Sequence, residues 1–70
     1  MTVIIWGPPG SGKTLNAERL AEFYKCNFIV DMWTEGDIIK SDGLYLTHQK
    51  VPGAIYIKDA LRALEADGQT

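Results

Sequence analysis

Short apolar runs alternate with polar and glycine-containing segments along the chain. Each run is short and apolar, which is typical of a strand. The first run is rich in β-branched residues, a pattern that suits a strand buried on both faces. The first run, TVIIW, stops at a Gly-Pro-Pro-Gly segment through which a strand cannot continue. The pattern predicts four strands, at residues 2–6, 27–30, 44–47 and 54–57.

Between the first two runs, the apolar positions change to a helical period. Ala17, Leu20, Ala21 and Tyr24 fall on one face of a helix. We therefore expect a helix that begins near Lys13 and ends near residues 26–27.

Two further segments carry helix signals. Asp59 precedes the apolar pattern ALRAL and Gly68 follows it, which predicts a last helix capped by Asp59. Thr34 and Asp37 have the spacing of a helix-capping pair, which predicts a helical turn over residues 35–40.

The order strand, helix, strand predicts parallel strands joined by a crossover, so the fold class is α/β. We expect a small three-layer fold with about four strands in a mainly parallel sheet and two main helices. The direction of the last strand is open, because residues 48–53 are too few for the usual crossover between neighbouring parallel strands. Within that segment, Pro52 and Gly53 are placed as a type II turn prefers.

Length and composition limit the number of domains, the partners and the location that the sequence predicts. The 70 residues, 46% of them hydrophobic, suffice for one small domain over residues 1–70. A net charge of −2 with scattered basic residues argues against nucleic acid as a partner. The single cysteine, Cys26, excludes an internal disulfide and fits a cytoplasmic protein. No apolar run is long enough to span a membrane, and the N-terminus lacks the features of a secretory signal.

The strongest chemical signal is GPPGSGKT at residues 7–14, between the first strand and the first helix. It matches G-x-x-x-x-G-K-[ST], in which glycines let successive N–H groups approach phosphate oxygens closely. Lys13 is expected to reach the β and γ phosphates, and Thr14 to ligate Mg²⁺. The predicted nucleotide-binding residues are Gly7, Pro8, Pro9, Gly10, Ser11, Gly12, Lys13 and Thr14.

This motif resembles the P-loop NTPase superfamily, and its wording is most similar to AAA-type ATPases and adenylate-kinase-like proteins. The resemblance is specific over residues 1–25. It implies a sheet in the order 2-3-1-4, a nucleotide at the carboxyl ends of the strands, and a last strand that runs parallel. The short chain also looks similar to small P-loop proteins encoded by phages and mobile elements.

The resemblance implies further site residues. In those families a second motif, four apolar residues and then an Asp, lies on a strand near the loop, and NFIVD is the close match here. The match implies that Asp31 shares the Mg²⁺ shell with Thr14; the alternative is an Asp that ends a strand and caps the next turn. AAA-type enzymes usually place a catalytic Glu after that Asp, and this chain has Met32 there. LYLTH resembles a strand whose polar end senses the terminal phosphate, which implies that Thr47 or His48 lies near the nucleotide.

The pattern favours a minimal protein that binds ATP, or GTP, together with Mg²⁺. Hydrolysis is expected to be weak or to depend on a partner, because phosphoryl transfer requires charge-stabilising groups that are not identifiable here. Self-association through open sheet edges could complete such a site. The alternative is a non-catalytic interaction module, derived from a P-loop protein, that binds or regulates a larger protein partner.

Overall fold

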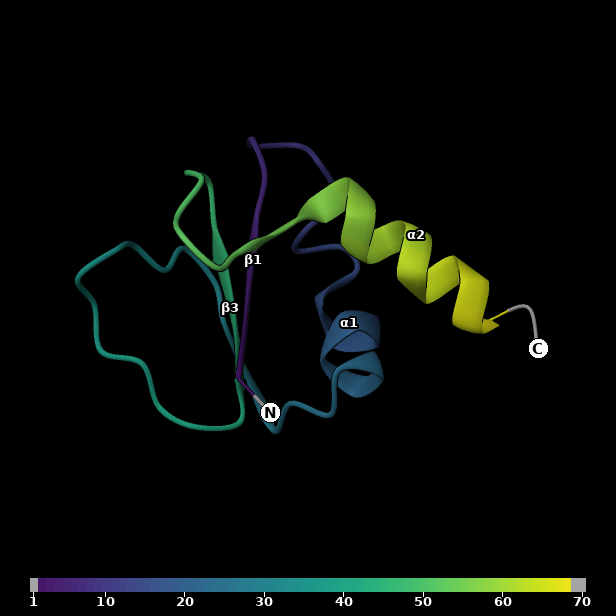
Figure 1. Ribbon diagram of the computed structural model, residues 1–70, viewed down its shortest axis with the longest axis horizontal. Coiled ribbons are helices and arrows are strands. Elements are labelled where there is room, and N and C mark those ends of the chain that lie inside the picture. Colours follow the sequence, from purple (N-terminus) through teal and green to yellow (C-terminus); the bar gives the residue numbers. More distant parts are fainter. Residues whose placement is uncertain (1, 69–70) are drawn as a thin grey trace.

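A four-stranded, fully parallel sheet forms the centre of the computed structural model, which describes residues 2–68 (Figure 1). The strands are β1 (Val3–Trp6), β2 (Phe28–Val30), β3 (Gly43–Thr47) and β4 (Ile55–Tyr56). They lie in the order β2-β3-β1-β4, as the family resemblance implied. All four predicted strands are therefore confirmed, with ends that differ by one residue.

The last strand, β4, runs parallel to β1, which decides the direction that residue spacing had left open. β3 and β4 lie on opposite sides of β1, so the chain crosses β1 without a helix. The crossing is short, and only two residue pairs join β1 and β4. Its turn is of the expected kind: the Ala54 N–H donates to the Val51 carbonyl at 3.1 Å, and Gly53 has φ of +83°.

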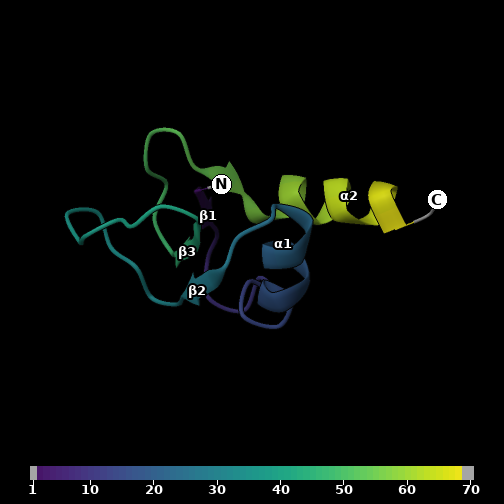
Figure 2. The same cartoon turned by 90° about the horizontal axis from the view of Figure 1, so that it is seen from below.

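Both helices, α1 (Ala17–Phe23) and α2 (Ile57–Gly68), pack on the same face of the sheet (Figures 1 and 2). Alternate side chains of the strands point towards them, as the two-residue period of a strand requires. Within residues 2–68, neither helix is long and apolar enough to cross a membrane. The core between helices and sheet consists of Val3, Ile5, Leu44 and Leu46 with Ala17, Leu20, Ala21, Ile57, Ala60 and Leu64.

The opposite face of the sheet is covered by loops. Trp33 and Val51 are buried against Tyr45 of β3, and Ile4 and Val30 pack around them. Figure 1 shows the segment between β2 and β3 standing out on this side, away from both helices. The three layers are therefore helices, sheet and loops, and β3 is buried on both faces.

Helix α1 is shorter than predicted at both ends. Instead of a helix from Lys13, residues 13–16 form turns, in which the side-chain amide of Asn16 donates to the Gly12 carbonyl at 2.9 Å. The helix ends at Phe23 because Lys25 adopts a left-handed conformation, with φ of 58°. The glycine-rich loop thus enters α1 through turns that are held by the Asn16 side chain and by backbone hydrogen bonds from Asn16 to Gly12 and from Ala17 to Thr14.

Two other helix predictions are wrong. Residues 35–40 contain no helix, although the Thr34 hydroxyl does donate to the Asp37 carboxylate at 2.8 Å. Gly36, with φ of +104°, takes a conformation that a right-handed helix cannot contain. Asp59 does not cap α2: the helix begins at Ile57, and Asp59 lies in its first turn, where its charge complements the helix dipole.

Candidate functional site

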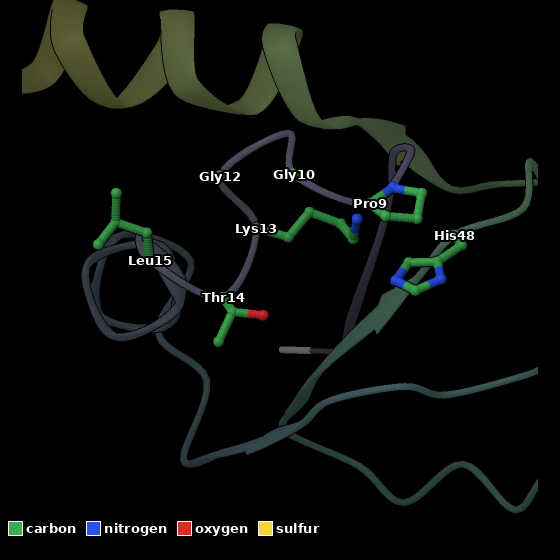
Figure 3. Close-up of a pocket in the computed structure, with 7 residues that line it drawn as sticks. All are labelled: Pro9, Gly10, Gly12, Lys13, Thr14, Leu15 and His48. Carbon is green, nitrogen blue, oxygen red and sulfur yellow. The ribbon is translucent and has the colours of Figure 1, made fainter.

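The glycine-rich loop, residues 7–14, leaves the carboxyl end of β1 and borders a hollow of about 310 Å³ (Figure 3). Ligands of open α/β sheets bind at this edge, outside the carboxyl ends of the strands. We call this the phosphate-loop hollow. It is lined by Pro9, Gly10, Gly12, Lys13, Thr14, Leu15 and His48.

Three glycines shape the loop in two different ways. Gly10 and Gly12 have φ of +80° and +94°, a left-handed conformation that favours glycine. Gly7 is required by packing instead, because a Cβ there would lie 2.6 Å from Cγ2 of Ile57 and 2.8 Å from Oγ of Ser11. The start of the loop is therefore pressed against the first turn of α2.

Lys13 lies beneath the loop with only 4% of its surface exposed. Its ammonium donates to the carbonyls of Gly7 and Pro8, at 2.6 and 3.0 Å, and to Oγ of Ser11 at 3.3 Å. Burial lowers the pKa of Lys13 below its ordinary value, and the negative charge of Asp31 opposes that shift. An ammonium that is partly removed from water attracts an anion more strongly than an exposed one.

The backbone of the loop offers donors beside this ammonium. The amides of Gly10, Gly12, Lys13 and Thr14 have no hydrogen-bond acceptor within residues 2–68. The amide of Ser11 differs, because it donates to the Pro8 carbonyl at 3.2 Å. Successive free N–H groups around a buried cation are the arrangement that binds phosphate oxygens.

Asp31, which directly follows β2, lies next to the loop. The Thr14 hydroxyl donates to Oδ2 of Asp31 at 3.2 Å, and Oδ1 accepts the N–H of Met32 at 2.9 Å. Asp31 thus caps the turn after β2 and also faces Thr14, so both expected roles are geometrically open to it.

Hydroxyl and carboxylate oxygens are ligands that Mg²⁺ prefers, so Thr14 and Asp31 fit a magnesium ion that is also held by phosphates and water. No cluster of three or more His, Cys, Asp or Glu side chains exists in the described part of the chain.

The end of β3 contributes one of the two residues expected there. His48 lines the phosphate-loop hollow, and Figure 3 shows its imidazole across from Lys13, beside Pro9. Thr47 is buried; its hydroxyl accepts the Gln49 N–H at 3.4 Å and it does not line this hollow. None of the lining residues carries a carboxylate, so a carboxylate base for hydrolysis does not line the hollow.

Sequence reasoning missed one lining residue, Leu15. Its side chain is 88% exposed and lines the hollow next to Thr14. The sequence did contain a signal for Leu15. It directly follows the loop and does not belong to the apolar face of the helix, so the helix does not carry it into the core.

Part of the sequence is similar to known proteins. The chain is similar to adenylate kinases. Over 42 residues it is 43% identical to the enzyme of Pyrococcus horikoshii, and 40% identical to those of Thermococcus sibiricus and Pyrococcus furiosus. The matched segment is 60% of this chain but only 17% of each relative. No family model matches the chain, and no solved structure matches it significantly.

Of the two groups that the loop resembles, the adenylate-kinase-like one is thus supported by sequence identity. The similarity concerns a P-loop region of kinase type, and most of each relative's length lies outside it.

Proposed function

We propose that this protein binds a nucleoside triphosphate, with ATP favoured over GTP, together with Mg²⁺. The observation that carries the proposal is the convergence of Lys13, Thr14 and the free loop amides on one hollow at the carboxyl edge of the sheet. Similarity to adenylate kinases is the reason for favouring ATP.

Each group has a defined part in binding. The Lys13 ammonium would exchange its bonds to loop carbonyls for bonds to phosphate oxygens, which carry full negative charge. The free amides would donate to the same phosphates. Thr14 and Asp31 would hold Mg²⁺, which offsets phosphate charge when it is bound. His48, which lines the same hollow, would contact the terminal phosphate.

We propose only weak or partner-dependent hydrolysis. Met32 follows Asp31 where a catalytic carboxylate would be needed, and no carboxylate lines the hollow. The activity of the relatives is not transferred, because the matched segment is 17% of their length. The cytoplasmic location and the likeness to phage-encoded proteins stay predictions.

Calorimetric titration of ATP and GTP, with and without Mg²⁺, tests the proposal. We expect the wild type to bind ATP with a Kd of about 10 to 500 μM, more tightly with Mg²⁺. Lys13→Ala should weaken binding roughly 10- to 100-fold, because it removes charge-assisted hydrogen bonds to phosphate.

Lys58→Ala is the matched control, because Lys58 is exposed on α2 and does not line the hollow. It should change the affinity less than about twofold. Circular dichroism establishes that each variant is folded. A folded wild type that gives no heat with either nucleotide would overturn the proposal and leave the interaction module as the better interpretation.

A further inference from the structure

Strand β2 forms one edge of the sheet, beside α1 (Figure 2). Phe28 and Ile29 are 36% and 37% exposed. Natural edge strands are usually blunted by a very short length, lysine, proline, a bulge or a covering element. Strand β2 has the short length, at three residues. Within Phe28–Val30 there is no charged residue and no proline, and within residues 2–68 no strand pairs with the outer side of β2.

A hollow of about 350 Å³ adjoins this edge on the helical side of the sheet. Ala21 of α1 and Ile29 of β2 contribute apolar surface to it, and Glu18 and Glu22 stand above it on α1. Four positions apart, the two carboxylates project from one side of the helix. Neither forms a salt bridge within the part of the chain that the structure describes. We call this the edge hollow.

We propose that β2 and the edge hollow bind an extended, basic segment of a partner protein, which adds a strand to the sheet. Main-chain hydrogen bonds to β2 would supply affinity, as in other complexes formed by strand addition. An apolar side chain of the segment would fill the hollow against Ile29. A lysine or arginine one or two positions along would reach Glu18 and Glu22, which form no salt bridge among residues 2–68.

The same charges argue against a second copy of this chain as the occupant. Pairing two β2 strands about a twofold axis would bring Glu18, Glu22 and Asp31 of both copies to one interface. Like charges that face each other destabilise such a contact. The edge hollow also shares no lining residue with the phosphate-loop hollow, so a bound partner segment and a bound nucleotide would not compete for the same surface.

The test uses a short fluorescent peptide of alternating valine and lysine, with a matched peptide in which glutamate replaces lysine. Fluorescence anisotropy measures binding to the whole chain. We expect the lysine peptide to bind, less tightly as salt is raised, and the glutamate peptide to bind at least about tenfold more weakly. In NMR spectra, the amides of Phe28–Val30 should shift, and those of the opposite edge, Ile55–Tyr56, should not.

Two variants locate the contact. Glu18→Lys combined with Glu22→Lys should weaken lysine-peptide binding about tenfold, whereas Glu35→Lys combined with Glu65→Lys, which makes the same charge change elsewhere, should not. Ile29→Lys should also weaken it. Unchanged ATP affinity in each variant shows that the fold persists.

Several results would overturn the inference. These are no binding of either peptide, equal binding of both, equal loss in the two double variants, or shifts confined to β4. Light scattering supplies one more: a dimer of the wild type that Ile29→Lys dissociates would mean that a second copy occupies the edge.

Discussion

The hydrogen bond from Thr14 to Asp31 joins residues that are 17 positions apart. At the scale of single residues, Asp31 has this contact and also accepts the Met32 N–H as a turn cap does, and a substitution separates the two roles. Asp31→Asn keeps the size and most hydrogen bonds of the side chain but removes its charge. We expect the gain in ATP affinity that Mg²⁺ produces to fall about tenfold, while affinity without Mg²⁺ stays equal or rises, because a negative charge near the phosphates is gone.

Titration calorimetry with and without Mg²⁺ measures both quantities. Glu65→Gln, on the exposed side of α2, is the control for loss of one carboxylate. If the Mg²⁺-dependent gain is the same in Asp31→Asn and wild type, Asp31 is only the cap of the turn after β2.

At the scale of elements, the loop between β2 and β3 is held by Thr34 and Asp37. Hydrogen bonds from the Thr34 hydroxyl and N–H, at 2.8 and 3.1 Å, lower the pKa of the Asp37 carboxyl below its ordinary 3.8. Because the folded pKa is depressed, this contact stabilises the loop above about pH 4 and is lost as pH falls through the folded pKa. Thr34→Val removes only the hydroxyl bond, so the Asp37 pKa should rise part of the way back.

Carboxyl carbon shifts followed by NMR against pH measure this pKa. Thr34→Ser keeps both donors and should leave the Asp37 pKa near the wild-type value. An Asp37 pKa that does not move in Thr34→Val would mean that the hydroxyl bond is absent in solution.

At the scale of the whole molecule, catalysis depends on what one chain can assemble. The phosphate-loop hollow contains a cation and amides but no carboxylate. The carboxylates of Glu18 and Glu22 beside β2 disfavour a second copy at that edge. We expect phosphate release from ATP to be slow, with a rate per chain that is independent of protein concentration. A colorimetric phosphate assay over a wide range of protein concentration checks this.

Lys13→Ala sets the background from contaminating enzymes in the same assay. A rate per chain that climbs with concentration would instead indicate that a second copy completes the site.

Local features of the sequence determined a large part of this protein. Most of the loop at residues 7–14 was predictable because the left-handed Gly10 and Gly12 and the bonds of Lys13 depend on the loop alone. Gly7 is the exception, because it packs against the distant Ile57. The four strands followed from short apolar runs bounded by Gly, Pro and Asp, and the type II turn followed from Pro52 and Gly53. Such signals need no knowledge of distant residues.

Only the tertiary structure decided which distant residues meet. The direction of β4 depended on its pairing with β1, and Asp31 came to Thr14 because parallel strands end at one edge of the sheet. His48 rather than Thr47 lines the hollow, because Thr47 is buried beneath the opposite loops. Helix α1 ends earlier than predicted because Lys25 is left-handed, and the helical turn predicted over residues 35–40 is absent because Gly36 is left-handed. The direction of β4 and the residues that meet at the hollow depend on contacts between distant segments, which form only when the chain folds.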